Sequence, residues 1–180
     1  PDEINAYAQY TYWVIAALVA LIIFSAYAAW QSKRNGIQSI VSFACGFFLC
    51  AIIAGTGHET LGRAVSGIDL VERVKASIPE KVNFYSVRLL DHTVPFYLGR
   101  TMIMVESPDE LEFGVKQEPE LWMPTLDAFI TRWKEDQTAY AIMVPEQFDA
   151  LQAQNFPMQE VDRDSRRVIV KHPDASNVTQ

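Results

Sequence analysis

Two long stretches of the chain contain no charged residue, and they limit the fold more than any other feature. They cover residues 4–32 and 35–57 and consist mainly of aliphatic, aromatic and small side chains. A helix needs about 20 apolar residues to cross the hydrocarbon core of a bilayer, which is about 30 Å thick. Each stretch meets this requirement. The sequence therefore predicts a transmembrane helical hairpin over residues 1–57, with spans at about 10–30 and 37–57.

The short polar turn between the two stretches predicts their direction. Lys33 and Arg34 in this turn are the only basic residues among the first 57. Because basic residues collect in cytoplasmic loops, we expect the turn in the cytoplasm and residues 58–180 on the opposite side of the membrane. Neither stretch contains Asp, Glu, Lys, Arg or His, which intramembrane chemistry usually requires. The spans are therefore predicted to be scaffold. Small residues four apart, such as Ser42 and Gly46 or Ala51 and Gly55, favour close packing of these helices on each other or on neighbouring helices.

Charge and histidine placement exclude several function classes. The 180-residue chain has a formal net charge of −7, all of it in residues 58–180, and no basic stripe. Nucleic-acid binding therefore has no electrostatic support. Three histidines are scattered along the chain, so neither a metal site nor a cofactor is predicted. His58 and Glu59, where the chain leaves the second span, have two interpretations: interfacial polar residues, which is the simpler one, or a metal or lipid-phosphate contact.

The two cysteines are predicted to be packing residues. Cys45 and Cys50 both lie in the second apolar stretch, five positions apart. On a helix of 3.6 residues per turn, side chains with this spacing point about 140° apart. A disulfide or a shared metal ion is therefore not expected from this pair.

Residues 58–180 alternate apolar runs with amphipathic segments. Apolar runs at 82–90, 101–105 and 139–144 predict central strands. Residues 158–161 and 167–171 predict a closing hairpin. Apolar spacing and caps predict four helices. The first has Ile68, Val71, Val74 and Ile78 on one face and is ended by Pro79, and the second begins with a capping box at Ser107, Pro108 and Glu110. The third is capped by Thr125 and buries Leu126, Phe129, Ile130 and Trp133, and the fourth runs from Glu146 to Asn155 and buries Phe148 and Leu151. The tail after Lys171 is expected to be frayed. This alternation predicts a layered α/β domain with a mixed, partly parallel sheet.

The connection "DHTVPFYLGR" at residues 91–100 has two open interpretations. In the structural one, Asp91 or Thr93 caps a short helix, Phe96, Tyr97 and Leu98 are buried against the sheet, and Gly99 ends the helix in a left-handed conformation. Arg100 is then a solvated residue at the end of a strand. In the other interpretation, a polar cluster contacts the rest of a larger protein or a phosphorylated ligand. Its candidate residues are Arg88, Asp91, Tyr97 and Arg100.

Several short motifs carry a resemblance to a known family. They are "DHTVPFYLGR", "ELEFG" at 110–114, Trp133, "NFPMQEV" at 155–161 and "RRVIV" at 166–170. Together they resemble the C-terminal region of bacterial membrane glycosyltransferases of the protein mannosyltransferase-like (GT-C) superfamily. In particular, they resemble relatives of the 4-amino-4-deoxy-L-arabinose transferase of lipid A. The resemblance covers nearly the whole chain, and it implies a location in a bacterial inner membrane with residues 58–180 in the periplasm.

The resemblance implies an enzyme that moves a sugar from a polyprenyl-phosphate donor to an acceptor such as lipid A. In that family the catalytic acidic residues lie in an outer loop far upstream, which has no counterpart here. We therefore expect a piece of a longer enzyme, no catalytic residue in this chain, and a role in structure or substrate access. The implied partners are the bilayer, the remaining transmembrane helices, the sugar donor and the acceptor. A membrane-tethered periplasmic binding or sensor module, or a structural assembly subunit, stays as an alternative.

Overall fold

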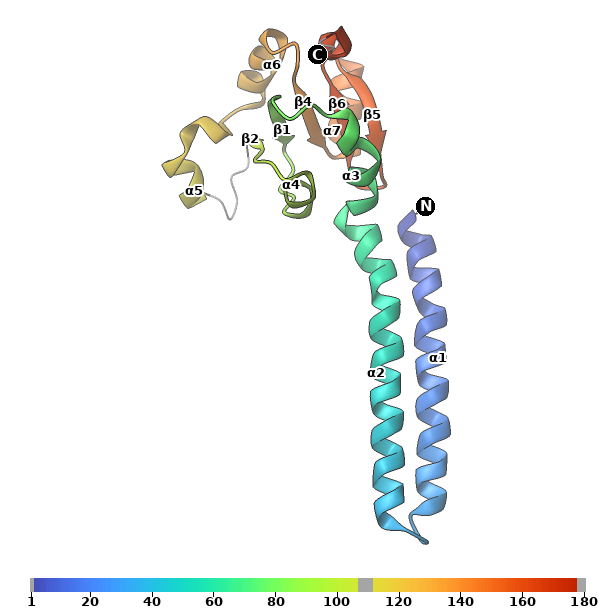
Figure 1. Cartoon of the computed structure of the whole chain (residues 1–180). Helices are drawn as coiled ribbons and strands as arrows, with labels where there is room; N and C mark the ends of the chain where they lie inside the picture. Colours follow the sequence, from blue (N-terminus) through green and yellow to red (C-terminus); the bar gives the residue numbers. More distant parts are fainter. Residues whose placement is uncertain (1, 107–111, 178–180) are drawn as a thin grey trace. The chain divides into compact units, whose positions relative to one another are not determined.

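The computed structural model describes residues 2–106 and 112–177 and divides the chain into two compact units (Figure 1). The first unit, Pro1–Val65, is called the helical unit below, and the second, Ser66–Gln180, the outer unit. The predicted capping box at residues 107–110 lies outside the described residues. Where the membrane-spanning part ends along the chain stays a prediction.

The helical unit is an antiparallel pair of long helices, α1 (Asp2–Gln31) and α2 (Gly36–Ser66). The segments Ile4–Gln31 and Gly36–Ser66 are long and apolar enough to cross a membrane. This confirms the two predicted apolar helices. Most of their large apolar side chains are exposed in the isolated chain, as expected for surfaces that face lipid or other helices.

Small residues lie between the two helices at intervals of eleven positions, or about three helical turns, and allow them to pack closely. They are Ala6, Ala17 and Ala28 on α1 and Gly46 and Gly57 on α2, all buried. A Cβ added to Gly46 would lie 2.4 Å from Cβ of Phe24, and one added to Gly57 would lie 2.4 Å from Cβ of Trp13. A side chain at either glycine would therefore push the helices apart.

The outer unit is built on a six-stranded sheet with strand order β3-β2-β1-β4-β6-β5. The strands are β1 (Phe84–Val87), β2 (Ile103–Val105), β3 (Trp122–Met123), β4 (Tyr140–Met143), β5 (Gln159–Arg163) and β6 (Val168–Lys171). Strands β3, β2, β1 and β4 are parallel to one another, whereas β6 runs antiparallel to both β4 and β5. The predicted mixed, partly parallel sheet and its closing hairpin are confirmed.

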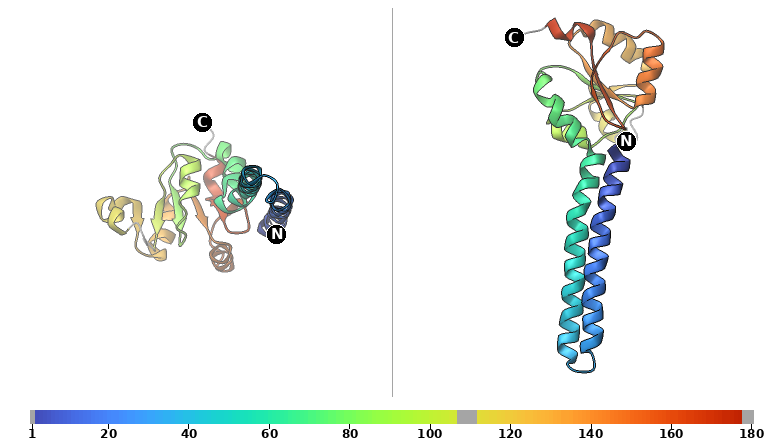
Figure 2. Two further views of the ribbon diagram at one scale, coloured as in Figure 1. Left: turned by 90° about the horizontal axis from the view of Figure 1, so that it is seen from below. Right: turned by 90° about the vertical axis from the view of Figure 1, so that its right-hand side faces the viewer.

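Helices cover both faces of this sheet (Figure 2). They are α3 (Ile68–Val74), α4 (Thr93–Leu98), α5 (Glu112–Gln117), α6 (Leu126–Glu135) and α7 (Pro145–Ala153), with 3₁₀ turns at Lys75–Ser77, Pro119–Leu121 and Pro173–Asn177. Helices α3 and α4 pack on one face, and α6 and α7 on the other. Successive strand residues point to opposite faces, so Phe84 joins the α3–α4 side of the core and Tyr85 the α6–α7 side.

Most helix predictions are confirmed. The hydroxyl of Thr125 accepts a hydrogen bond from the Ala128 N–H at 3.2 Å and caps α6, which buries Phe129 and Trp133. Helix α7 begins one residue earlier than predicted, because Pro145 occupies its first position. Asn155, predicted to end this helix, has a left-handed φ of 55°.

The prediction of a frayed tail after Lys171 is wrong for residues 172–177, whereas residues 178–180 lie outside the described part of the chain. His172 is buried, and its N–H donates to the carbonyl of Ala139 at 2.9 Å. The 3₁₀ turn that follows places Ala175 against the α3–α4 side of the core. The polar composition of this segment suggests a disordered tail, because the residues that it packs against are distant in the sequence.

Candidate functional site at the carboxyl edge of the sheet

The strand order identifies the edge of the sheet where a ligand site is expected. From β1 the chain passes through α4 to β2 and on to β3, and it then returns to β4 on the opposite side of β1. The direction of winding therefore reverses between β1 and β4. In open α/β sheets, ligands bind outside the carboxyl ends of the strands at such a point. The residues that follow β1, β2 and β4 are thus the first candidates.

Arg88 and Glu106 occupy this edge, directly after β1 and β2. The Arg88 Nε donates to Glu106 Oε2, and its Nη2 donates to Oε1 at 3.1 Å. Arg88 Nη1 also donates to Gln147 Oε1 of α7 at 3.1 Å, and Glu106 Oε1 accepts from the Leu126 N–H at the start of α6 at 3.0 Å. One ion pair thus ties together two strands and two helices.

The geometry of this ion pair fixes the charges of both groups. Its hydrogen bonds raise the pKa of Arg88, and they lower the pKa of Glu106 together with the bond from the Leu126 N–H. Both residues have a positive φ, 51° at Arg88 and 68° at Glu106, which is uncommon outside glycine. The carboxylate is held ionised and already accepts from several donors, so it is a poor general acid and is not a free base.

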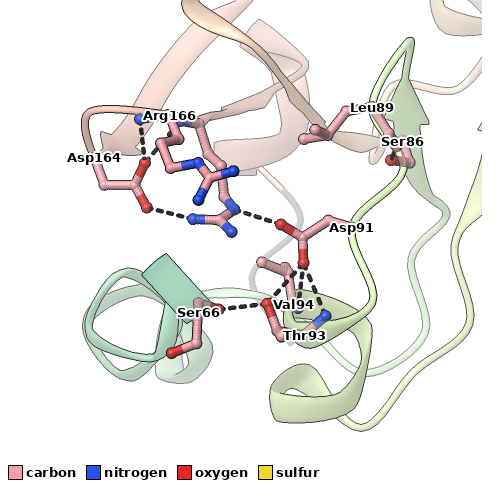
Figure 3. Close-up of polar contacts among 9 residues, drawn as sticks. Ser66, Ser86, Leu89, Asp91, Thr93, Val94, Asp164 and Arg166 are labelled. Carbon is pink, nitrogen blue, oxygen red and sulfur yellow. Dashed lines mark hydrogen bonds and ion pairs between the residues drawn. The ribbon is translucent and has the colours of Figure 1, made fainter. Parts of the chain in front are cut away.

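Asp91 forms a second, buried network at the same edge (Figure 3). Its Oδ2 accepts from Arg167 Nε at 2.5 Å, and both side chains are only 6% exposed. Its Oδ1 accepts from the N–H groups of Thr93 and Val94 at 2.8 and 2.9 Å, at the start of α4. Burial raises the pKa of a carboxyl group, but the hydrogen bonds from Val94, Thr93 and Arg167 outweigh it and hold the pKa of Asp91 below its ordinary value.

Arg167 extends this network to the point where the chain enters the outer unit. Its Nη1 donates to Asp164 Oδ2 at 3.1 Å in the β5–β6 turn. The guanidinium also covers Gly67, since a Cβ there would lie 3.1 Å from Nη1. The Thr93 hydroxyl lies 2.5 Å from the Ser66 carbonyl oxygen and 2.8 Å from Asp91 Oδ1, and its single proton serves one acceptor at a time. The entry segment, α4 and the hairpin are thus joined by one polar cluster.

The connection from Asp91 to Arg100 agrees only in part with the structural interpretation. Asp91 caps α4, and Gly99 ends it with a left-handed φ of 70°. Phe96, however, is 78% exposed, so the prediction that it is buried is wrong. A six-residue helix presents one face to the core, and Val94 and Leu98 occupy that face instead.

Arg100 differs from the predicted solvated residue. Its Nη2 donates to the Pro79 carbonyl at 2.9 Å. Its Nε and Nη1 are buried and have no acceptor within the described part of the chain. Tyr97 lies on α4, and its ring packs against the α3–α4 side of the core. Its backbone carbonyl accepts a hydrogen bond from Lys75 Nζ at 2.8 Å.

The four residues predicted as a polar cluster therefore bind separate partners. The hydrogen bonds described above for Arg88, Asp91, Tyr97 and Arg100 join no two of the four to each other. Three of them serve contacts within the outer unit, and Arg100 alone keeps buried donors without an acceptor in the described residues. Their contact with a ligand or another domain stays a prediction.

Two adjoining cavities lie beside Arg100. The first has a volume of about 360 Å³ and is lined by Asp91, His92, Arg100, Thr101, Met102 and Met104, among others. The second, of about 340 Å³, shares Thr101, Met102 and Met104 with it and extends to Leu121.

Sequence reasoning missed the burial of Arg167 and the role of Glu106. Arg167 is a charged residue beside an apolar strand, and nothing in the local pattern distinguishes it from the exposed Arg166.

The described residues contain no group of three His, Cys, Asp or Glu side chains suited to a metal ion. The ring of His58 lies beside that of Tyr10, with centroids 6.0 Å apart, and its predicted alternatives stay open.

Two apolar helices of membrane-spanning length, continued by a mixed α/β domain, define the class of the protein: a membrane protein with an extramembrane α/β domain. The family model described as the aminoarabinose transferase C-terminal domain matches residues 70–172. The chain belongs to this family, which confirms the resemblance found in the sequence.

Two crystal structures of ArnT from Cupriavidus metallidurans are similar to the chain. The structure bound to undecaprenyl phosphate is 38% identical, with a TM-score of 0.83 over 92% of this chain and 30% of that one. The apo structure is 37% identical, with a TM-score of 0.86 over 98% of this chain and 32% of that one. The chain thus spans about a third of the length of these relatives. No curated protein matches it.

Proposed function

We propose that the chain is the C-terminal portion of an inner-membrane glycosyltransferase that moves 4-amino-4-deoxy-L-arabinose from a polyprenyl-phosphate carrier to lipid A. The family match and the identity of 37–38% to ArnT, extending over both helices and the outer unit, carry this proposal. The undecaprenyl phosphate bound by one of those relatives supports a polyprenyl-phosphate donor. The bilayer, the upstream transmembrane helices and lipid A are the further partners.

Within this enzyme, the portion described here supports structure or substrate access rather than the chemical step. The carboxylates at the carboxyl edge favour this role, because Glu106 is bound by Arg88 and Asp91 by Arg167. Ionised carboxylates with lowered pKa values and filled hydrogen-bond sites are unsuited to proton transfer at neutral pH. The groups that carry out catalysis then lie upstream in the full-length enzyme.

Glu106→Gln in the full-length enzyme tests this assignment. The product is measured by mass spectrometry of lipid A after incubation with the polyprenyl-phosphate sugar. The amide keeps the size of the side chain and one acceptor oxygen, so we expect a turnover number within a few-fold of the unmodified enzyme. A folded variant that binds donor normally but has lost turnover by a hundredfold or more would place chemistry in this portion.

The charge bias of the helical unit supports a cytoplasmic turn at Lys33 and Arg34 and a periplasmic outer unit. Alkaline phosphatase is active only after export to the periplasm. A fusion after Val170 is therefore expected to be active and a fusion in the turn inactive, and the opposite pattern would reverse the proposed orientation.

A further inference from the structure

The first turn of α4 is bound to the residues at which the chain enters the outer unit. The Thr93 hydroxyl lies 2.5 Å from the carbonyl oxygen of Ser66, which is the last residue of α2. A Cβ added to Gly67 would lie 3.3 Å from Cγ2 of Val94 in the same turn of α4. Helix α4 therefore stays beside Ser66 and Gly67, whatever the orientation of the two units.

The length of α2 limits the distance between α4 and the membrane. The predicted span ends at about residue 57, and α2 continues for nine residues to Ser66. Nine residues of helix rise about 14 Å, of which the headgroup layer takes about 5–7 Å. The start of α4 is thus about 10 Å or less from the headgroups, and a helix of six residues such as α4 spans about 9 Å. Side chains of α4 can therefore reach the lipid interface.

Phe96 is the apolar side chain that α4 presents away from the core. Its exposed fraction is 78%, whereas Val94 and Leu98 of the same helix are buried. Its ring contacts that of the neighbouring Tyr97, with centroids 5.4 Å apart. Single exposed apolar residues are common on protein surfaces, so exposure alone does not identify a contact. The charges around α4 supply the further evidence.

Acidic residues are absent from α4 and from the segment that follows it. Residues 92–105 form the longest run without Asp or Glu in residues 58–180, whose net charge is −7. Two cations accompany this run: Lys75, whose Nζ donates to the Tyr97 carbonyl at 2.8 Å, and Arg100. This part of an acidic domain thus suits the surface of a membrane that contains anionic lipids.

A second exposed aromatic residue, Phe113 on α5, has the opposite surroundings. Its exposed fraction is 77%, close to that of Phe96. It lies within residues 106–120, which contain six acidic residues. Anionic headgroups repel such a segment. Of these two rings, Phe96 therefore has the surroundings that a lipid surface requires.

The face of α4 also favours lipid over a protein partner. A protein interface buries about 800 Å² on each partner and has several apolar side chains at its centre. On the outward side of α4, the exposed His92 and Gly99 lie about one turn to either side of Phe96. A single aromatic ring among polar groups and cations is typical of a side chain that anchors a protein at the membrane interface.

We propose that α4 anchors the outer unit to the lipid bilayer. The ring of Phe96 enters the boundary between headgroups and acyl chains, and the ammonium group of Lys75 contacts lipid phosphates. The anchor turns the carboxyl edge of the sheet, where α4 begins, toward the membrane. The inference relies on the predicted end of the span at residue 57 but not on sugar transfer, which its test does not measure.

The experiment measures the surroundings of a nitroxide label at position 96 of the full-length enzyme in phosphatidylethanolamine–phosphatidylglycerol nanodiscs. Phe96→Cys is made in a cysteine-free background, in which Cys45 and Cys50 of this chain are replaced by alanine. Electron paramagnetic resonance reports collisions of the label with oxygen, which concentrates in hydrocarbon, and with a polar nickel chelate, which stays in water. A label in lipid collides mainly with oxygen, a label in water mainly with the chelate, and a label covered by protein with neither.

We expect the label at position 96 to collide mainly with oxygen. Its collision rate with the chelate should be at least about fivefold lower than that of a label at Gln137, because hydrocarbon excludes polar solutes. Gln137 is exposed in the turn before β4, at the opposite edge of the sheet. A label in place of Phe113 is the matched control and should not collide mainly with oxygen.

The role of the cation is tested in the same nanodiscs. Lys75→Glu should raise the collision rate of the label at position 96 with the chelate at least about twofold, because anionic lipids repel the new carboxylate. Lys134→Glu makes the same change at an exposed position on α6 and should leave the rate unchanged. Equal rates in the two variants would overturn the contact of Lys75 with lipid phosphates.

Collisions mainly with the chelate at position 96 would overturn the anchor. Low rates with both reagents would overturn it in favour of a contact with the upstream portion of the enzyme. Equal oxygen collisions at positions 96 and 113 would overturn the selection of α4. If the label at position 96 prevents folding, a label in place of His92, on the same side of α4, decides by the same criteria.

Discussion

The side chains of Asp91 and Arg167 meet at 2.5 Å in the interior of the outer unit, although 76 positions separate them in the sequence. Both are 6% exposed. The pair joins the start of α4 to the start of β6, and through Thr93 and Gly67 it also holds the segment by which the chain enters the unit. It is therefore the polar link on which the packing of these three segments depends.

Asp91→Ala is expected to destabilise the outer unit strongly. Removing one partner of a buried ion pair costs about 3–5 kcal/mol, and the remaining contact of Arg167 with Asp164 places the expected loss near the lower end. The free energy of unfolding is measured by urea denaturation of the full chain in micelles. Near-UV circular dichroism reports on the buried aromatic cluster of Tyr85, Phe129 and Trp133.

Asp162→Ala is the matched control for this prediction. It breaks an ion pair with Arg73 of similar length, 2.6 Å, but the Arg73 side chain is 51% exposed. An exposed pair contributes about 0–1 kcal/mol. Equal losses for Asp91→Ala and Asp162→Ala would show that the buried network has no special role.

The stabilisation by Asp91 should depend on pH in a defined direction. The pKa of Asp91 is lowered in the folded chain, so the folded state binds a proton less readily than the unfolded state. In the unfolded state the pKa of an Asp is about 3.9. The contribution is therefore complete above about pH 4 and is lost as pH falls further. The stability difference between the unmodified chain and Asp91→Asn should be constant from pH 5 to 7 and shrink below about pH 4. A difference that grows on acidification would contradict the lowered pKa.

Gly99→Ala should destabilise the outer unit because of backbone strain alone. Gly99 has a φ of 70°, and nothing lies within 4 Å of the position that a Cβ would take. A residue with a side chain in this conformation costs about 1 kcal/mol or more. Gly114→Ala is the control, since Gly114 has equal space but lies in α5 without a positive φ. Alanine stabilises a helix interior by about 0.5–1 kcal/mol relative to glycine, so the two thermal shifts should have opposite signs.

Gly57→Val should disrupt the helical unit, whereas Gly55→Val should not. A Cβ at Gly57 would overlap the side chain of Trp13, while nothing lies within 4 Å of the same position at Gly55. The measurement is thermal unfolding in micelles followed by far-UV circular dichroism and Trp fluorescence. Loss of helix pairing in both variants, or in neither, would place the contact face of α2 elsewhere.

The elements predicted from local patterns are those that depend on local chemistry. The continuous apolar runs of β1 and β4 and the cap at Thr125 are visible within a few residues of sequence, and all three are present. The general prediction of close helix packing was also sound. Of the predicted positions, Gly46 lies against Phe24 of the other helix, whereas nothing lies within 4 Å of Gly55. The contact of Gly57 with Trp13 was not predicted, because small residues are frequent on every side of these helices and only the partner helix selects the face.

Features that depend on long-range contacts were not predicted. The burial of Arg167 requires Asp91 and Gly67, and the docking of His172 requires Ala139. The positive φ values of Arg88 and Glu106 arise where two strands end side by side at the same edge of the sheet. No spacing within the sequence indicates these relationships, since they follow from the strand order.

A chimeric enzyme tests the central proposal most directly. Residues 1–180 replace the corresponding C-terminal region of ArnT from Cupriavidus metallidurans, which the chain matches at 37–38% identity. The chimera is expressed in cells that lack their own transferase, and lipid A is analysed by mass spectrometry for added aminoarabinose. Because we propose that the chain supplies the non-catalytic C-terminal portion of such an enzyme, we predict modified lipid A. A chimera that inserts in the membrane and folds, yet leaves lipid A unmodified while the parent enzyme modifies it, would contradict the proposal.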